Sequence, residues 1–401
     1  MGISEKINFV VRHPKAVADY FHLERQLSRN RKEGIYNFLF QCDAKGHFPY
    51  LNPYYDVLKS NKNVDVYFSG ANLDGDVSTF LMNNGVSSDR IIRHNSLVKL
   101  TDWDIYMSPT SWGNIFPKNK NCFRIQISVA LAEKNIQPGE NLINFDTIFV
   151  NGPTHHDVLK RILFDPFPEA KTRCKTFDVG FAKIDQLLNG YYDHETIRKI
   201  LKIAGGDSRK IILYAPNWEN TSALYKYRDS VFEVLKKTDY IILIKLHYIS
   251  MLSAEKLDST GDLDIRRLLD RYGQEENMRI IRGASIDPYM SLSSLLITDY
   301  GGAALEFMCT GKPIVYLDCP EFFDIRGKDI LEYRSRDSGY LVSDVERLPE
   351  IVEKALRGDS SKVRAQAELV DRLLYNRGSA AEAGIRVIFE QLLARKSRWL
   401  M

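Results

Sequence analysis

The stretch Leu295–Pro320, LLITDYGGAALEFMCTGKPIVYLDCP, most constrains how this chain can fold. An apolar run leads into the pair Gly301-Gly302, and a helix-like segment carrying Glu306 follows before a second apolar run. Glycines allow a ligand to approach the backbone, and the start of a helix offers free N–H groups to a phosphate. The pattern therefore predicts the ligand-facing edge of a parallel α/β sheet, with a plain βαβ turn as the alternative.

Length and composition indicate a globular protein of more than one domain. The 401 residues have room for two or three domains. A net charge of only +3 argues against a dedicated nucleic-acid binder, so no nucleic-acid partner is expected. The five cysteines form no CxxC pair, which indicates a reducing compartment and no zinc site.

The sequence offers no signal peptide, no myristoylation site and no apolar run of the roughly 20 residues that a spanning helix needs. We therefore expect a cytoplasmic protein. Two basic segments, Arg12–Arg31 and the final ARKSRWLM, leave peripheral contact with the inner face of the cell membrane open. A solvated helix face is the simpler interpretation of both.

Short apolar runs alternate with longer helix-like segments along the chain. This alternation predicts an α/β fold with parallel sheets covered by helices on both faces. The expected strands are Ile35–Gln41, Val64–Phe68, Ile105–Met107, Phe123–Ile127, Thr147–Asn151, Lys210–Tyr214, Tyr240–Leu246, Arg279–Ile281, Leu295–Thr298 and Pro313–Leu317. The expected helices are Pro53–Ser60, Asp76–Asn84, Tyr225–Lys237, Leu263–Tyr272, Asp287–Ser293, Ala303–Thr310, Leu348–Leu356 and Lys362–Leu393.

A polar break near Leu187–Ser208 separates two such series. We therefore expect two Rossmann-like domains facing a cleft, the first over residues 1–188 and the second over residues 205–375. The remaining residues, 376–401, are expected to form a helix that packs back on the first domain.

Polar residues follow four successive strands expected in the second domain, where ligands bind in open α/β sheets. One histidine at a strand end is more often structural than functional, but four strand ends carrying such groups are more than a core requires. The expected site residues of this domain are Asn217, Lys245, His247, Arg282, Ser285, Thr298, Asp299, Gly301, Gly302 and Glu306.

Five motifs of this domain resemble those of the CDP-glycerol glycerophosphotransferase family, the teichoic-acid primases and polymerases and their capsule-synthesis relatives. They occur in the family's order over roughly Arg209–Pro320, and GFAKID at Gly180–Asp185 resembles a further motif before the linker. The five are YAPNW at Tyr214–Trp218, KLHY at Lys245–Tyr248, IDPYM at Ile286–Met290, ITDYGG at Ile297–Gly302 and GKPIVY at Gly311–Tyr316.

The resemblance implies a glycosyltransferase fold of the B type, with the nucleotide donor bound to the second domain. His247 and the turn after Asp299 would contact the donor pyrophosphate, Glu306 the ribose hydroxyls, and backbone groups near Arg282–Ile286 the base. None of these five motifs contains an Asp-x-Asp metal clamp, so Lys245 and helix N-termini are expected to balance the phosphates, without metal or cofactor.

The sequence departs from the family at two places. The family's DYSS is DYGG here, a form that also resembles nucleotide-sugar epimerases, and we expect positive φ at these glycines. The family's His-Gly pair, whose histidine is the proposed general base, is Val129-Ala130 in RIQISVALAEKN, although Gln126 and Lys134 fit the pattern. Because valine cannot take a proton, an active protein needs another base.

His47 is the first candidate for that base, because it follows a first-domain strand and histidine titrates near neutrality. An exposed loop histidine is an equally weighted alternative. His155 and His156 come next, although they also fit the ordinary start of a helix. The loop Ser108–Gly113 is a candidate for binding the acceptor.

The leading hypothesis is a transferase that moves glycerol phosphate or ribitol phosphate from a CDP-activated donor to a hydroxyl of a lipid-linked or polymeric cell-surface glycan. One alternative is a glycosyltransferase with a nucleotide-sugar donor. The other is a catalytically silent binding homologue, which the missing His-Gly pair keeps open.

Overall fold

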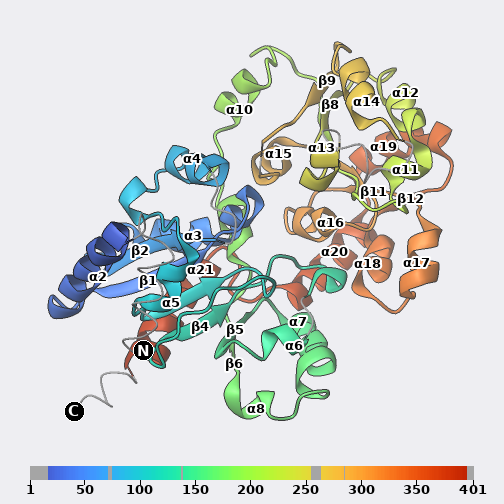
Figure 1. The fold of residues 1–401 in the computed structure, drawn as a ribbon. Helices are drawn as coiled ribbons and strands as arrows, with labels where there is room; N and C mark the ends of the chain where they lie inside the picture. The colour runs from blue at the N-terminus through green and yellow to red at the C-terminus, as the bar shows by residue number, and fades with distance from the viewer. Residues whose placement is uncertain (1–16, 71–74, 137–138, 254–262, 284, 395–401) are drawn as a thin grey trace. The chain divides into compact units, whose positions relative to one another are not determined.

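The structure, a computed structural model, describes residues 17–70, 75–136, 139–253, 263–283 and 285–394 (Figure 1). The chain divides into two compact units. Unit 1 comprises Met1–Val129, Ile136–Asp185 and Leu374–Met401, and unit 2 comprises Ala130–Asn135 and Gln186–Leu373.

Unit 1 is built on a six-stranded parallel sheet in the order β2-β1-β3-β4-β5-β6. Its strands are β1 (Tyr36–Gln41), β2 (Val64–Ser69), β3 (Ile105–Ser108), β4 (Phe123–Gln126), β5 (Thr147–Val150) and β6 (Lys175–Asp178). Its main helices are α2 (Val17–Lys32), α3 (Phe48–Leu58), α4 (Gly75–Asn83), α5 (Asn95–Leu100), α6 (Gly139–Leu142), α7 (Pro153–Leu159), α8 (Ala170–Arg173) and α21 (Ala380–Val387).

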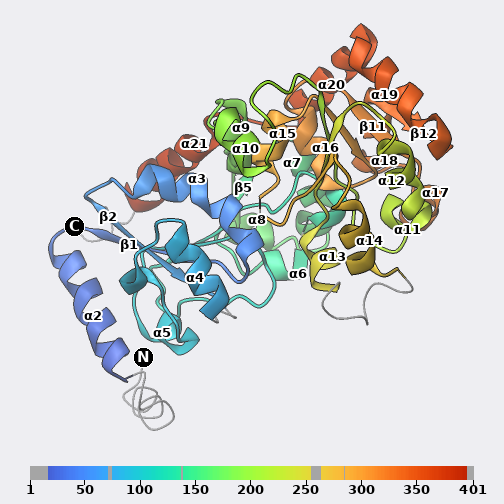
Figure 2. The same cartoon turned by 90° about the horizontal axis from the view of Figure 1, so that it is seen from above.

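The central strand β1 has apolar residues on both faces because both faces of the sheet are covered by helices. Phe38 and Phe40 pack with Leu51 of α3 and with α21, which lies beside α3 (Figure 2). Leu39 points to the opposite face and packs with Leu27 of α2. This two-sided burial explains why the strand reads as one continuous apolar run.

Unit 2 has a second six-stranded parallel sheet, in the order β12-β11-β10-β7-β8-β9. Its strands are β7 (Ile211–Tyr214), β8 (Ile241–Ile244), β9 (Met278–Ile280), β10 (Leu295–Thr298), β11 (Ile314–Leu317) and β12 (Tyr340–Val342). Its helices include α10 (His194–Ile200), α11 (Ala223–Tyr227), α12 (Asp229–Leu235), α13 (Tyr248–Ser253), α14 (Ile265–Tyr272), α15 (Asp287–Leu292), α16 (Gly302–Met308), α17 (Pro320–Arg326), α18 (Leu331–Arg334), α19 (Leu348–Arg357) and α20 (Ser360–Leu373), and α9 (Asp185–Leu188) begins at the unit boundary.

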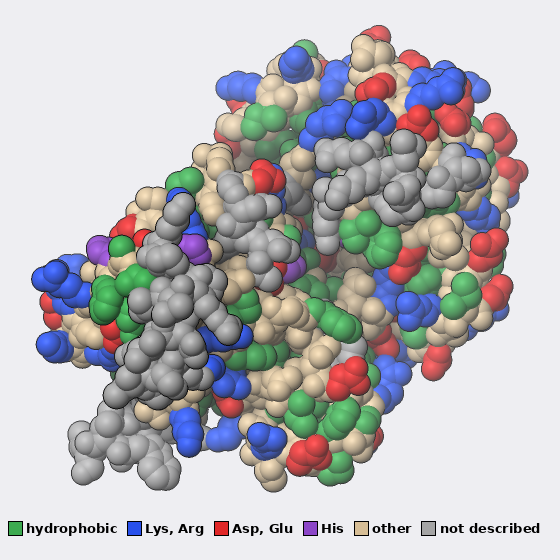
Figure 3. All heavy atoms as spheres, in the orientation of Figure 1, with side chains coloured by type: hydrophobic (Ala, Val, Ile, Leu, Met, Phe, Trp, Pro, Cys, Tyr) green, Lys and Arg blue, Asp and Glu red, His purple; other side chains and the backbone are tan. Residues whose placement is uncertain are grey.

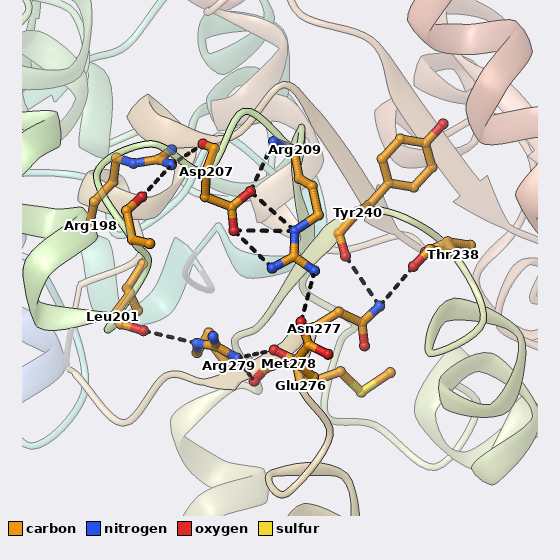
Figure 4. A network of polar contacts seen from close by, with 11 residues as sticks. Arg198, Leu201, Asp207, Arg209, Thr238, Tyr240, Glu276, Asn277, Met278 and Arg279 are labelled. Atoms are coloured by element: carbon orange, nitrogen blue, oxygen red, sulfur yellow. Dashed lines mark hydrogen bonds and ion pairs between the residues drawn. The ribbon is translucent and has the colours of Figure 1, made fainter.

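A polar network ties α10, at the start of unit 2, to the sheet (Figure 4). The Arg279 side chain donates to the carbonyl oxygen of Leu201 at 2.9 Å, and Arg198 donates to that of Asp207. The Asp207 carboxylate in turn pairs with Arg209 at 2.8 Å. The segment that follows the polar break is therefore anchored to unit 2.

The predicted α/β class with parallel sheets is confirmed, but two helix predictions are wrong. The helix predicted over Lys362–Leu393 is interrupted after α20, where Asn376 and Gly378 take φ values of 40° and 75° that a helix cannot continue through. The helix predicted over Tyr225–Lys237 is likewise divided between α11 and α12, at Arg228 with φ 46°. The edge strands β6 and β12 were not predicted, because β6 is short and mostly polar and β12 has only 3 residues.

No helix within the described ranges combines the length and apolar character needed to cross a membrane. On the face drawn in Figure 3, basic and acidic side chains are interspersed, in keeping with the small net charge of +3.

Candidate functional site

In the sheet of unit 2, the order in which the chain adds strands reverses between the neighbouring strands β7 and β10. From β7 the chain builds outward through β8 and β9 on one side, and from β10 through β11 and β12 on the other. The loops at such a switch point diverge and leave a crevice, where open α/β sheets bind their ligands. Asn217 and Asp299 follow these two strands, so the YAPNW and ITDYGG motifs meet at the switch point.

Asp299 holds the two loops of this crevice together. Its carboxylate accepts hydrogen bonds from the backbone N–H groups of Asn217 and Ala223, each at 3.0 Å. The Thr298 hydroxyl donates to the Ala215 carbonyl oxygen at 2.7 Å. Burial raises the pKa of Asp299, while these N–H donors favour its charged form. The polar atoms of Asp299 and Thr298 find hydrogen-bond partners within the protein, so these two side chains hold the loop after β7 in place.

The expectation of positive φ in the glycine turn is wrong. Gly301 has φ −80° and ψ 163°, an extended conformation open to any residue, and Gly302 begins α16. A Cβ added to Gly301 would meet Asp299 Oδ1 at 3.7 Å, and one added to Gly302 would meet the Ala132 Cβ at 3.9 Å. Both are ordinary van der Waals distances, so only the close approach of a ligand would require glycine here.

His247 follows β8 beside the β7 loop. Its ring stacks on Trp218, with centroids 6.1 Å apart, and its Nδ1 accepts a hydrogen bond from the Ile249 backbone N–H at 3.3 Å. Burial, and then the charges of Lys245 and Lys134, lower its pKa to about 4. The ring is therefore neutral at pH 7 and carries its proton on Nε2, which makes Nε2 a hydrogen-bond donor.

Lys134 reaches the same part of unit 2 from the segment Ala130–Asn135. Its Nζ lies 3.2 Å from the Glu219 carboxylate and 4.7 Å from the centre of the Tyr300 ring. Its backbone N–H donates to the Glu332 carboxylate at 2.9 Å. Sequence reasoning omitted Lys134 from the site, although its fit to the family pattern was the available signal. The buried Lys134 ammonium group thus helps to hold this segment against the rest of unit 2, together with the ion pair of Glu133 and Arg334 at 3.5 Å.

The remaining residues expected in unit 2 differ in their surroundings. Lys245 is buried and donates to the Leu246 carbonyl oxygen at 3.2 Å, and Glu306 is buried within α16. Arg282 is exposed after β9. The Ser285 hydroxyl bonds the Asp287 side chain at 2.8 Å, at the start of α15. Because β9 is the edge strand and β8 lies between it and β7, Arg282 and Ser285 are farther from the switch point than the other groups.

Unit 1 has its own switch point, between β1 and β3. The loop after β1 carries His47, and the loop Ser108–Gly113 follows β3, so the structure brings these two candidates to one crevice position. The His47 Nδ1 accepts a hydrogen bond from the Asp43 backbone N–H at 3.2 Å, and burial lowers the pKa of the ring. Its neutral form therefore also carries the proton on Nε2.

His155 and His156 are not brought to that switch point, because they follow β5, which lies beyond β4 in the sheet. The His155 Nδ1 accepts from the Asn151 backbone N–H at 3.2 Å, and burial lowers its pKa to about 3. His156 pairs with Asp178 at 2.7 Å. Both histidines have local structural partners, and neither lies at the switch point where a base would be expected.

Val129 and Ala130 follow β4 and mark the boundary at which the chain passes from unit 1 into unit 2. Ala130 is buried and Val129 is half-buried. Neither side chain can exchange a proton, so nothing at this position replaces the family histidine chemically.

Residues 154–390 match the family model of the CDP-glycerol:poly(glycerophosphate) glycerophosphotransferases. The chain belongs to this family. The teichoic acid poly(glycerol phosphate) polymerase of Bacillus spizizenii is 26% identical to it over 192 residues, which make up 45% of each chain. The match therefore spans about half the length of that curated relative.

Solved structures identify the fold as that of the B-type glycosyltransferases. The wall teichoic acid polymerase TagF superposes with a TM-score of 0.66 at 16% identity, covering 98% of this chain and 99% of that one. TagF has also been solved as a variant soaked with CDPG, with a TM-score of 0.64 at 17% identity and coverage of 98% and 99%. A putative UDP-N-acetylglucosamine 2-epimerase from Listeria monocytogenes gives 0.58 at 15% identity, with coverage of 89% and 97%.

Proposed function

We propose that the protein transfers glycerol phosphate or ribitol phosphate from a CDP-activated donor to a hydroxyl of a lipid-linked or polymeric cell-surface glycan. Family membership supports the reaction class. The observation that carries the proposal is the convergence of the YAPNW, KLHY and ITDYGG motifs on the β7–β10 switch point, with His247 and Lys134 beside it.

In the proposed reaction, the acceptor oxygen bonds to the phosphorus that carries the polyol. The bond from that phosphorus to the bridging oxygen breaks, and CMP leaves with the bridging oxygen. The proton of the acceptor hydroxyl passes to a base.

Four side chains of unit 2 suit the donor in this reaction. The Nε2–H of neutral His247 donates to a pyrophosphate oxygen, and the Lys245 and Lys134 ammonium groups offset phosphate charge. Glu306, buried on α16, accepts from the ribose hydroxyls. The described part of the chain contains no group of three or more His, Cys, Asp or Glu residues placed to hold a metal ion.

His47 is the proposed catalytic residue of unit 1. To accept a proton at Nδ1, its ring must release the Asp43 backbone N–H, whereas at Nε2 it acts only as a donor while neutral. The candidate therefore has two separable roles, proton acceptor and hydrogen-bond donor. The Val129-Ala130 pair favours one further function, a silent homologue that binds the donor without turnover.

Assays of CMP and nucleoside-diphosphate release distinguish these functions. CMP release from CDP-glycerol or CDP-ribitol with a glycan acceptor supports the proposal. Nucleoside-diphosphate release from a nucleotide sugar instead supports the glycosyltransferase alternative. Calorimetric binding of a CDP-polyol without release of either product supports the silent homologue.

A further inference from the structure

A lysine-lined pocket of about 560 Å³ opens on unit 1 beside its edge strand β6, away from the switch point of that unit. Lys160 comes from the short helix η5 (Lys160–Phe164), Lys171 from α8, and Lys175 from the start of β6. Three separate elements thus bring one lysine each to the same pocket.

The pocket carries an excess of positive charge. Lys160, Lys171 and Lys175 face a single carboxylate, that of Asp165. All three lysines are exposed, and within the described ranges none of their ammonium groups makes an ion pair or a side-chain hydrogen bond. Three ammonium groups that the protein leaves uncompensated form a suitable binding place for a ligand with more than one negative charge.

The rest of the lining indicates what kind of anion fits. Phe164 and Phe177 are half-buried and give the pocket a carbon surface, while Thr176 offers a hydroxyl at its side. Ammonium groups form charge-assisted hydrogen bonds with phosphate oxygens, and a carbon surface contacts methylene and methine groups. A chain that alternates phosphate with a short carbon backbone uses both features.

We propose that this pocket binds the phosphodiester groups of a polyol-phosphate chain. The identity of the ligand rests on the proposed function, whereas the anion-binding character rests on the three lysines alone. Because β6 runs parallel to β1, its first residues lie at the opposite end of the sheet from the loop that carries His47. A chain segment bound here is therefore away from the reacting hydroxyl and would hold the polymer without taking part in the chemistry.

Protection of the sheet edge and contact with a membrane each account for fewer features of the pocket. A lysine on an edge strand blocks pairing with another sheet, but this applies only to Lys175, since Lys160 and Lys171 lie on helical segments. A membrane surface favours apolar side chains that protrude into the interface, whereas Phe164 and Phe177 are half-buried within the pocket. The observations favour a soluble chain over a lipid headgroup.

The test measures binding of a synthetic oligo(glycerol phosphate) to the full chain by equilibrium dialysis, without any nucleotide donor. The triple variant Lys160→Gln/Lys171→Gln/Lys175→Gln should bind about tenfold or more weakly, and wild-type binding should weaken as salt rises. The matching Lys→Arg triple variant should retain binding. The control Lys62→Gln/Lys99→Gln/Lys354→Gln removes three exposed lysines elsewhere and should leave binding unchanged.

Equal affinity of the wild type and the Lys→Gln triple variant would overturn the proposal. Salt-dependent cosedimentation with phosphatidylglycerol vesicles that requires the three lysines, without oligomer binding, would also overturn it, in favour of a lipid headgroup. Since no turnover is measured, an inactive enzyme that still binds the oligomer through these lysines would contradict the proposed function and leave the pocket assignment supported.

Discussion

The two units present the same architecture with very different content at their switch points. In unit 2 the crevice is organised by Asp299, whose buried carboxylate ties the loops after β7 and β10. In unit 1 the corresponding loops carry His47 and Ser108–Gly113, while the family's histidine position is occupied by Val129. The contrast indicates that the proposed donor side has kept the family pattern apart from the Gly301-Gly302 pair, whereas the proposed acceptor side has lost the histidine of its family motif.

The largest expected effect tests the side that has changed. His47→Ala should lower turnover about a hundredfold, the range for loss of a general base, and should leave donor affinity intact. His47→Gln separates the two roles, because its amide can replace the Nε2–H donor but cannot accept the proton. Steady-state release of CMP, with donor binding measured by calorimetry, gives both quantities.

If His47→Gln retains turnover, His47 is a hydrogen-bond donor and the base lies elsewhere. Full activity in His47→Ala removes the residue from the mechanism altogether. The double change Val129→His/Ala130→Gly completes the series. An inert wild type that becomes active with this change would show that unit 1 is a disabled site.

Substitution of one buried carboxylate in each unit, Asp299 in unit 2 and Asp185 in unit 1, allows the two units to be compared directly. Asp299→Asn leaves backbone N–H groups of the β7 loop without a full set of acceptors, so it should cost about 1–3 kcal/mol of unfolding free energy and weaken donor binding. Asp185 in unit 1 accepts from the Ala381 backbone N–H at 2.8 Å. Asp185→Asn should change the stability of unit 1 and spare donor binding. Hydrogen exchange followed peptide by peptide assigns each loss to a unit.

Asp185 also predicts how the free energy of unfolding depends on pH. Burial raises the pKa of Asp185 to about 6 from its ordinary value of 3.8. The folded state therefore binds the proton more tightly than the unfolded state, and the contribution of Asp185 to stability increases as the pH falls from about 6 toward 4. Asp185→Asn should abolish this part of the pH dependence. An identical profile in wild type and variant would contradict the assigned shift.

Substitution of His247 tests donor binding in unit 2, and its expected effect is smaller than that of His47→Ala. His247→Ala should weaken donor binding about tenfold, the value of one hydrogen bond to a charged group. Because its pKa is about 4, the affinity contributed by the neutral ring should stay constant between pH 8 and pH 5. His156→Ala, which removes the partner of Asp178 in unit 1, is the control. Affinity that rises as the pH falls through 6.5 would instead indicate an imidazolium.

The sequence allowed prediction of the strands at the centre of each sheet, because strands buried on both faces are continuous apolar runs, as β1, β7 and β10 show. Strand order could not be predicted, since periodicity carries no information about which strands become neighbours. The sequence therefore could not predict that His47 and Ser108–Gly113 follow neighbouring strands at one switch point. The sequence also could not predict that Ala130–Asn135 belongs to unit 2. The contacts of this segment, such as that of Lys134 with Glu219, join residues far apart in the chain.

The smallest expected effect separates backbone strain from ligand approach in the glycine turn. Since neither glycine has positive φ and a Cβ has room at both, Gly301→Ala and Gly302→Ala should leave the fold intact. Gly302→Ala, at the start of α16, should change stability by less than about 1 kcal/mol. Any loss of donor affinity then reports a phosphate close to the turn, because neither substitution strains the backbone.

Gly180→Ala in unit 1 is the contrasting control. Gly180 has a φ of +101°, and a Cβ added there would lie 2.4 Å from the Tyr375 carbonyl oxygen, so this change should destabilise the fold. Unchanged donor affinity in both turn variants would mean that the phosphates do not approach Gly301-Gly302, and that the glycines at this position only connect β10 to α16.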